Sequence, residues 1–320
     1  MDLHEKKQGE LSQEFPFINE LIPVADGLDG FKQFVEKYPG FNFCPYLADK
    51  TEDEWKISTS RQYMNQVLPR FLYIPVNIGD SDEEMLAKCI QYADDNSAVA
   101  AVNITKPHKS APVLRKYFYG DEDSSQNVDT LIRAPADGKL HPFDLNAPAF
   151  INWFEESVGL FKDKDIVIVG AGGVGEPVAK HIDRRGPSSI HLVDIKDRSN
   201  LAAALTNNTH YYHHLSEVDL NSSGLIVINA SGKDGISDDT GLLEFIASQP
   251  SIGIFADLRP HLHIDIVEQA KAYGWEAYTG NGMNARNDYE LLTGIMDYLD
   301  IAPCDRPSFS EFSARVAAAS

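Results

Sequence analysis

Four glycines lie close together in the segment Gly170-Ala171-Gly172-Gly173-Val174-Gly175, which has the spacing GxGxxG. An apolar run of strand length leads into it from Asp165, and a segment compatible with a helix follows from about Glu176 to Arg185. In this context the first glycine permits a tight turn, the second lets the backbone approach a pyrophosphate, and the third lets helix and strand pack closely. N–H groups at the helix start would then bind phosphate oxygens. The segment therefore predicts a dinucleotide-binding site.

Asp194 ends the next predicted strand, close to the spacing of about 20 residues expected for the acidic residue of such a site. A carboxylate there accepts hydrogen bonds from the ribose hydroxyls and repels a 2′-phosphate, so NAD is predicted in preference to NADP. Lys196 and Arg198 follow and are able to hold a 2′-phosphate. Because Asp197 lies between them, a solvated charged loop is the favoured interpretation.

A parallel sheet is needed to position the glycine segment, and the order of the apolar runs predicts such a sheet. Strands and helices alternate at a spacing that predicts parallel strands with right-handed crossovers. Residues 1 to about 50 give no clear pattern. The predicted strands are 71–77, 98–104, 165–170, 189–194, 224–229 and 253–257, and the predicted helices are 82–93, 112–119, 147–161, 176–185 and 290–299. The helix at 147–161 is predicted to link two domains.

Bulk properties restrict the partners of the chain. It has 320 residues, enough for two ordinary domains, and a formal net charge of -20, which disfavours nucleic acid and anionic membranes as partners. No apolar run approaches the roughly 20 residues that span a bilayer, and the polar N-terminus has no signal-peptide core. The cysteines Cys44, Cys89 and Cys304 form no CxxC pair, so neither a zinc site nor a disulfide framework is predicted, and a cytoplasmic location is the simplest expectation.

A second group of short motifs resembles the shikimate and quinate dehydrogenase family. Asn103-Ile-Thr-Lys-Pro-His-Lys109 is similar to the NVTxPHK signature and lies before the glycine segment, as in that family. The other motifs follow in the family's order: ISTS at 57–60 and Asn65 for HSxSP and its following Asn, NVDT at 127–130 for AVNT, Asp144 for the acid of NTDG, INA at 228–230 for INAT, GNGM at 280–283 for GLGM, and YELLTG at 289–294 for FELWTG. This collinearity identifies the chain as a divergent member by resemblance.

The resemblance implies a two-domain α/β enzyme. An N-terminal α/β substrate-binding and catalytic domain would comprise residues 1–146, to which a C-terminal helix at 285–320 returns, and a Rossmann-type domain with a parallel sheet, residues 147–284, would bind NAD. The reaction would be reversible hydride transfer between the nicotinamide and a secondary alcohol of a shikimate- or quinate-like cyclic hydroxy acid, which in that family belongs to aromatic amino acid biosynthesis. The partners expected are a small-molecule substrate and, as an option, a second copy in a homodimer.

Site residues carry over from the same motifs. Lys109 and Asp144 would form the catalytic pair, because oxidising an alcohol requires removal of the hydroxyl proton and a lysine positioned by an acid can accept it. Ser58 and Ser60 would hold the substrate carboxylate. The remaining substrate-binding candidates are Asn103 and Thr105 for ring hydroxyls, with Asp129 and Asn284. The cofactor-binding set is Gly170, Ala171, Gly172, Gly173, Val174, Gly175, Asp194, Asn229, Ala230, Gly282 and Met283.

Several departures from the family pattern bear on the identity of the substrate more than on the fold or the redox chemistry. Asp129 stands in place of the Asn of AVNT, and no glycine follows Asp144. A few residues, including the family's substrate-binding Gln, are missing between Met283 and Tyr289, where Asn284 or Asn287 is a candidate replacement. The family's Tyr near Ala256-Asp-Leu-Arg259 is also absent, and Arg259 is a candidate anion ligand there.

Two alternative functions share this fold. A methylenetetrahydrofolate-dehydrogenase-like enzyme should carry a Tyr-x-x-x-Lys arrangement in its first domain, which Tyr63 and Tyr73 do not supply. A catalytically silent regulator that binds NAD or a metabolite is the alternative from another class. The histidines at 210, 213 and 214 are predicted to lie on a surface strand or loop, and no metal site is expected.

Overall fold

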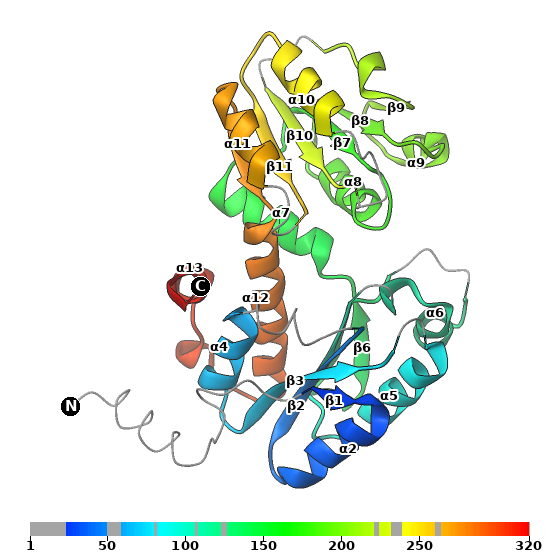
Figure 1. Cartoon of the computed structure of the whole chain (residues 1–320), viewed down its shortest axis with the longest axis vertical. Coiled ribbons are helices and arrows are strands. Elements are labelled where there is room, and N and C mark those ends of the chain that lie inside the picture. Colours follow the sequence, from blue (N-terminus) through cyan, green and yellow to red (C-terminus); the bar gives the residue numbers. More distant parts are fainter. Residues whose placement is uncertain are drawn as a thin grey trace, which may run out of the picture. The chain divides into compact units, whose positions relative to one another are not determined.

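The computed structural model describes residues 24–49, 59–79, 82–105, 108–122, 127–220, 224–231, 239–259 and 264–319. The chain divides into two compact units. Unit 1 comprises Met1–Leu145 with Asp288–Ser320, and unit 2 comprises Asn146–Asn287. Both are α/β units built on parallel-rich sheets, as predicted (Figure 1).

Unit 1 contains a six-stranded sheet in the order β1-β3-β2-β4-β5-β6, in which β5 and β6 run antiparallel to their neighbours and the other pairs are parallel. Its strands are β1 (Ala25–Asp26), β2 (Asn42–Ala48), β3 (Phe71–Asn77), β4 (Ala101–Ile104), β5 (Thr130–Arg133) and β6 (Leu140–Phe143). Its helices include α2 (Gly27–Lys37), α4 (Thr59–Val67), α5 (Glu83–Asp95), the short 3-10 helices η1 (His108–Ser110) and η3 (Pro303–Asp305), α6 (Pro112–Tyr119) and α13 (Phe309–Ala319).

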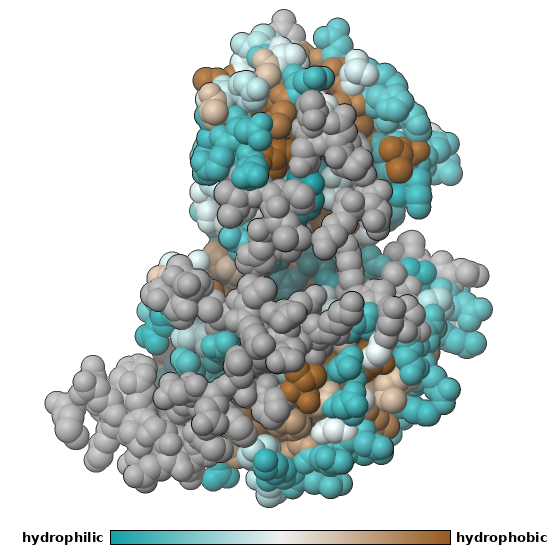
Figure 2. Space-filling model, viewed as in Figure 1, coloured by the Kyte–Doolittle hydropathy of each residue, from teal (hydrophilic) through white to brown (hydrophobic). Residues whose placement is uncertain are grey.

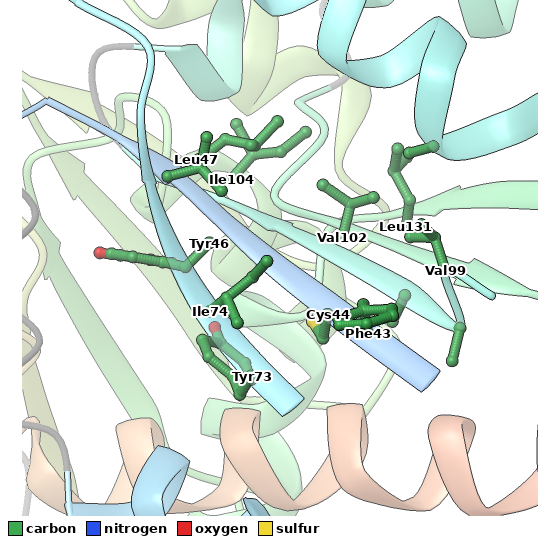
Figure 3. Packing of buried hydrophobic residues seen from close by; sticks show 14 of the residues in the cluster. Phe43, Cys44, Tyr46, Leu47, Tyr73, Ile74, Val99, Val102, Ile104 and Leu131 are labelled. Atoms are coloured by element: carbon green, nitrogen blue, oxygen red, sulfur yellow. The ribbon is translucent and has the colours of Figure 1, made fainter. Parts of the chain in front are cut away.

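The centre of unit 1 is the pair β2 and β3, whose side chains are buried on both faces of the sheet. Cys44 and Tyr46 share one face with Tyr73, while Leu47 lies on the other face with Ile104 (Figure 3). Strands covered on both sides are apolar throughout instead of alternating. Helix α4 lies over the tyrosine face with α13 and the C-terminal part of α12 (Asn281–Tyr298), and α2 and α5 cover the other face (Figure 1).

Unit 2 contains six parallel strands in the order β12-β11-β10-β7-β8-β9. The order reverses between β7 and β10, and in doubly wound sheets ligands bind at the carboxyl ends of the strands at this point. Its strands are β7 (Asp165–Val169), β8 (Ser189–Val193), β9 (Thr209–Tyr212), β10 (Leu225–Asn229), β11 (Ile254–Asp257) and β12 (Glu276–Thr279). Its helices include α7 (Asn146–Ser157), α8 (Gly175–Asp183), α9 (Ser199–Ala204), η2 (Leu215–Glu217), α10 (Asp239–Ser248), α11 (Ile264–Ala272) and the start of α12.

The structure extends and corrects the predicted elements. Strand β3 and helix α6 have the predicted bounds, but the strand expected at 98–104 is regular only in β4, and before it Val99 makes an isolated bridge to Phe43. The closing helix begins at Asn281 instead of 290. Hydrophilic residues dominate the described surface on the face shown in Figure 2. Among the described residues, no helix is long and apolar enough to cross a bilayer.

Candidate active site

In the glycine turn of unit 2, residues 170–175, nearby backbone atoms leave no room for a side chain at two of the glycines. Gly170 has a φ of +85°, and a Cβ there would lie 2.7 Å from the backbone of Ser231. A Cβ on Gly175 would collide with the carbonyl oxygen of Gly170. At Gly172, by contrast, the Arg198 side chain, at 3.9 Å, is what a Cβ would meet among the described residues. Packing among the described residues therefore does not explain why this position is a glycine, whereas close approach of a pyrophosphate would.

Asp194 lies directly beneath this turn, at the carboxyl end of β8. Its carboxylate accepts hydrogen bonds from the N–H of Ala171 at 2.8 Å and the N–H of Lys196 at 2.8 Å. It also forms an ion pair with Arg198 at 3.3 Å. The side chain is therefore already bonded within the protein, and Arg198 partly neutralises the charge that would repel a 2′-phosphate. The structure places an acid and a base together at the predicted ribose position.

The predicted nicotinamide-side residues take part in a second polar network. Asn229, at the end of β10, donates to Asp257 at 3.2 Å and accepts from the Ser231 hydroxyl at 2.6 Å. Asp257 in turn holds Arg259, whose Nη2 lies 2.6 Å from a carboxylate oxygen. Arg259, an anion-ligand candidate by sequence, is thus engaged by an internal carboxylate.

The remaining cofactor candidates lie at the carboxyl ends of strands or at the start of α12. Ala230 follows β10, and its N–H donates to the carbonyl oxygen of Val169 at 2.8 Å. Met283 is buried. Gly282 is explained by packing, because a Cβ there would collide with the indole ring of Trp153. Asn284 lies in the first turns of α12 in unit 2, where its N–H donates to Gly280.

Lys109, a predicted catalytic residue, lies beside Asp129 in unit 1. Lys109 Nζ lies 3.9 Å from a carboxylate oxygen of Asp129, and the two side chains are 27% and 2% exposed. The carbonyl oxygen of Lys109 accepts from the N–H of Val128 at 3.0 Å, which ties the lysine backbone to the start of β5. A partly exposed ammonium beside a buried acid is an arrangement able to exchange a proton with a substrate hydroxyl.

Asp144, predicted as the partner of Lys109, follows β6. Thr130 pairs with Phe143 at the end of the antiparallel β5–β6 ladder, and Asp129 directly precedes Thr130 while Asp144 directly follows Phe143. The N–H of Leu145 donates to Asp129 at 3.1 Å. Burial raises the pKa of the Tyr119 phenol, and the charges of Asp144 and Asp129 raise it further. The structure therefore brings both acids to one site, with Asp129 in ion-pair contact with the lysine.

The substrate-binding candidates of the NVTxPHK-like motif surround this pair. The Asn103 amide points to the carbonyl oxygen of Asp129 and the hydroxyl of Thr130, each at 3.4 Å. Thr105 follows β4, and its N–H donates to Leu47 at 3.2 Å. His108, which the sequence reasoning did not assign, lies 2.9 Å from Asp49 and is 2% exposed.

The predicted carboxylate-binding serines have different outcomes. Ser58 lies outside the described residues. Ser60 lies in the first turn of α4, is buried, and its hydroxyl donates a hydrogen bond to Asp288. Burial raises the pKa of the Asp288 carboxyl, while Arg61 and the Ser60 hydroxyl act in the opposite direction. Asp288 and Arg61 were missed by sequence reasoning; the signal available was that Arg61 directly follows the ISTS motif, where HSxSP has a proline.

Among the described residues, no group of three or more His, Cys, Asp or Glu side chains is placed to hold a metal ion. The predicted histidine segment forms β9 and the residues after it, and His210 stacks on His191 with ring centroids 5.3 Å apart. His213 and His214 are exposed.

Comparisons with known proteins identify relatives at low identity. No family model matches the chain. A shikimate dehydrogenase (NADP(+)) of Lysinibacillus sphaericus is 31% identical over 152 residues, or 46% of this chain and 52% of the relative. A protein of the same name in Rhizobium meliloti is 26% identical over 211 residues, or 62% of this chain and 71% of the relative. The chain spans just over half the length of the Lysinibacillus sphaericus relative, 52%, and of a third protein of this name, from Methanobrevibacter smithii, 57%.

Solved structures extend the likeness over most of the chain. Shikimate 5-dehydrogenase from Thermus thermophilus, in complex with NADP(H) and shikimate, is 20% identical with a TM-score of 0.60, covering 88% of this chain and 100% of that one. Quinate dehydrogenase from Corynebacterium glutamicum, in complex with NAD, is 17% identical with a TM-score of 0.61, covering 87% and 99%. At this identity the likeness shows a shared fold. The chain is thus similar in sequence to shikimate dehydrogenases, as its motifs predicted, and it shares their two-domain α/β fold.

Proposed function

We propose that the protein is a nicotinamide-dependent dehydrogenase that transfers a hydride between the cofactor and a secondary alcohol of a shikimate- or quinate-like cyclic hydroxy acid. The observation that carries the proposal is the Lys109–Asp129 pair, with an Nζ to carboxylate distance of 3.9 Å, at the strand ends of unit 1. The glycine turn of unit 2 supports it, because a Cβ at Gly172 would meet no described residue more closely than the Arg198 side chain at 3.9 Å, which leaves room there for a dinucleotide.

Lys109 is the proton-transfer residue in this proposal. As the hydride leaves the alcohol carbon, the hydroxyl proton passes to the neutral amine of Lys109, and the carboxylate of Asp129 stabilises the ammonium that forms. Asp144, which directly follows β6 as Asp129 directly precedes β5, orients the substrate hydroxyl or shares the proton. In the reverse direction the ammonium returns the proton to the alkoxide as the carbonyl is reduced.

For the cofactor, we propose that NAD is preferred over NADP because Asp194 would accept hydrogen bonds from the ribose. The named relatives are NADP(+)-dependent by their names, and Arg198 in ion-pair contact with Asp194 gives this chain a donor for a 2′-phosphate. The proposal therefore concerns a preference and not an exclusion of NADP. A dinucleotide's pyrophosphate would be held by the backbone of the glycine turn and the start of α8.

The test is a screen of hydroxy acids, including quinate and shikimate, with NAD and NADP, followed through the absorbance of the reduced nicotinamide. Turnover of a cyclic hydroxy acid supports the proposal. Cofactor and acid binding without turnover, measured by calorimetry, would instead support the catalytically silent regulator. A homodimer, a cytoplasmic location and a role in aromatic amino acid biosynthesis remain predictions.

A further inference from the structure

Lys109, the proton-transfer residue of the proposed reaction, lies in a helix that is too short to hold itself in place. The 3-10 helix η1 consists of three residues, and its turn is closed by a hydrogen bond from the N–H of Ala111 to the carbonyl oxygen of His108 at 2.9 Å. A single turn fixes several backbone dihedral angles for one hydrogen bond and is unstable by itself. The direction in which Lys109 points must therefore be set by contacts between η1 and the rest of unit 1.

Two of these contacts use backbone atoms. The N–H of His108 donates to the carbonyl oxygen of Thr105 at 2.9 Å, and the carbonyl oxygen of Lys109 accepts from the N–H of Val128 at 3.0 Å. They connect η1 to the residue after β4 and to the segment before β5. Both bonds act on the main chain alone, so they do not by themselves fix the rotation of η1 about its points of attachment.

The third contact is made by a buried side chain. His108 Nε2 lies 2.9 Å from a carboxylate oxygen of Asp49, and the His108 side chain is 2% exposed although that of the next residue, Lys109, is 27% exposed. Asp49 directly follows β2, and the N–H of Thr105 donates to the carbonyl oxygen of Leu47 near the end of that strand. The ends of β2 and β4 therefore meet at one edge of the sheet, and the imidazole joins η1 to this edge.

The carboxylate of Asp49 also determines how the imidazole is held. An ionised carboxylate only accepts hydrogen bonds, so the Nε2 of His108 carries a proton and donates it. A charge-assisted bond of this kind is stronger than one between neutral groups. Because a buried polar ring is costly without a partner, the loss of Asp49 would release the imidazole and, with it, the orientation of η1.

A second His–Asp pair of unit 1 has the same chemistry in a different setting. His141 Nε2 lies 2.8 Å from Asp137, but these side chains are 47% and 48% exposed and the residues are four positions apart. Asp49 and His108 are 59 positions apart, and their bond joins two strand ends. Exposed pairs contribute little to stability, so His141 serves as a reference for a pair that holds nothing else in place.

We propose that Asp49 and His108 are positioning residues of the hydride-transfer reaction, whose hydrogen bond orients η1 so that the amine of Lys109 meets the substrate hydroxyl. The inference rests on the proposed dehydrogenase function and deepens it. The hydroxyl proton passes between the substrate and Lys109, with Asp129 beside the amine. No bond of the substrate is made or broken at His108 or Asp49.

Kinetics with a hydroxy acid that is turned over test the orientation. His108→Phe keeps a ring of similar volume and removes the donor. It should lower kcat about 10- to 100-fold, because misplacement of a catalytic group by about 1 Å has a cost of up to about 100-fold. KM should change much less. His108→Gln, whose side-chain amide can donate to Asp49, should recover most of the loss, and the matched control His141→Phe should leave kcat unchanged.

A merely structural role predicts a different result when the lysine is absent. In a Lys109→Ala background, His108→Phe should lower kcat no further, since the group that it positions is gone. An equal fold-loss in both backgrounds, or an unchanged kcat in a folded His108→Phe variant, would overturn the proposal. Thermal unfolding identifies a variant that fails to fold. Asp49→Asn changes the same bond from its other partner, and it should lower kcat because the bond loses its charge.

Chemical labelling separates this inference from the proposed function. Acetic anhydride modifies accessible amines, and peptide mass spectrometry measures the extent at each lysine. In His108→Phe, labelling of Lys109 should rise, because its side chain moves away from Asp129. Lys116 and Lys139, which are 70% and 62% exposed, are internal controls and should keep their labelling. Unchanged labelling of Lys109 would reject the positioning role. Increased labelling in the variant, with no hydroxy acid turned over by the wild type, would support the positioning role and reject the dehydrogenase.

Discussion

The glycine turn of unit 2 and the charged edge of unit 1 are built in different ways. In the turn, backbone atoms determine the geometry: a Cβ at Gly170 or Gly175 would meet the backbone of Ser231 or Gly170. At the candidate site of unit 1, side-chain pairs determine the geometry, such as Lys109 with Asp129. A backbone-built site tolerates changes in the residues around it, whereas a site built from side-chain pairs changes its ligand when one charge is replaced. Cofactor binding should therefore depend on fewer residues than substrate choice.

The largest expected effect of a substitution lies in unit 1. Lys109→Ala should lower kcat about 100- to 10,000-fold, the typical contribution of a positioned proton-transfer group. Lys109→Arg should restore little, because a guanidinium stays protonated and cannot act as a base. Cofactor affinity, measured by fluorescence titration, should be nearly intact. A near-normal kcat in Lys109→Ala with an active substrate would show that the assigned role is wrong.

The two acids beside Lys109 refine this prediction. Asp129→Asn should impair kcat more than Asp144→Asn, because Asp129 is the acid in ion-pair contact with the lysine. When Asp129→Asn is combined with Lys109→Ala, the loss in kcat should be much smaller than the sum of the two single effects on the activation free energy if the lysine and the acid act as a unit. A larger loss of kcat in Asp144→Asn than in Asp129→Asn would show that Asp144 is the catalytic partner of Lys109, as the family motif predicts.

In unit 2 the two glycines provide a matched pair. Gly172→Val should weaken NAD binding about 10- to 100-fold while the protein stays folded, since its side chain has room except toward the ligand. Gly175→Val should instead destabilise the fold. Calorimetry for binding and thermal unfolding for stability separate the two. Unchanged NAD affinity in a folded Gly172→Val variant contradicts the dinucleotide assignment.

A smaller effect is expected on the choice between the two cofactors. Asp194→Ser should narrow the preference for NAD over NADP by about tenfold, since it removes both a ribose acceptor and a charge. Arg198→Ala should weaken NADP binding alone. Titration of both cofactors against each variant is the measurement, and tighter binding of NADP by the wild type would refute the preference.

The smallest effect concerns stability and pH. Burial, with a contribution from His210, lowers the pKa of His191 from 6.5 to about 4. The unfolded chain therefore binds this proton at a higher pH than the folded one, so the stability contributed by neutral His191 is lost as the pH falls from about 6.5 toward 4. The loss at about pH 6 should be about 1 kcal/mol. Urea unfolding of His191→Gln should show a flatter pH dependence; an identical slope would exclude His191 as its source.

Much of unit 2 could be predicted from sequence because strand, turn and helix are contiguous there. Several elements of unit 1 were not predicted, and for strand β2 the physical reason is clear. It lies centrally between β3 and β4, yet it contains Pro45, which is usually confined to edge strands, and its burial on both faces removes the alternating pattern.

The candidate site was predictable to a similar extent. Asn103, Lys109 and Asp129 lie in two motifs that the β4–β5 ladder joins, so local pattern was sufficient to nominate them. The contact between Ser60 and Asp288 joins distant parts of the chain, and no spacing rule indicates it. Asp129 was assigned to substrate binding, and only the structure places it beside the lysine.

Unit 1 is discontinuous, and this has a consequence for how the protein is made. Its core includes Leu291 and Ile295 of α12 and Phe312 of α13, while unit 2 is one uninterrupted stretch. During synthesis from the N-terminus, unit 2 is complete before the chain that finishes unit 1 has been translated. The N-terminal part of unit 1 must therefore remain incompletely folded, with exposed hydrophobic surface, while unit 2 is synthesised. A premature stop after residue 287 would release a chain in which unit 2 is complete and unit 1 is not. The residues that seal the core of unit 1 and supply Asp288 are therefore translated after the whole of unit 2.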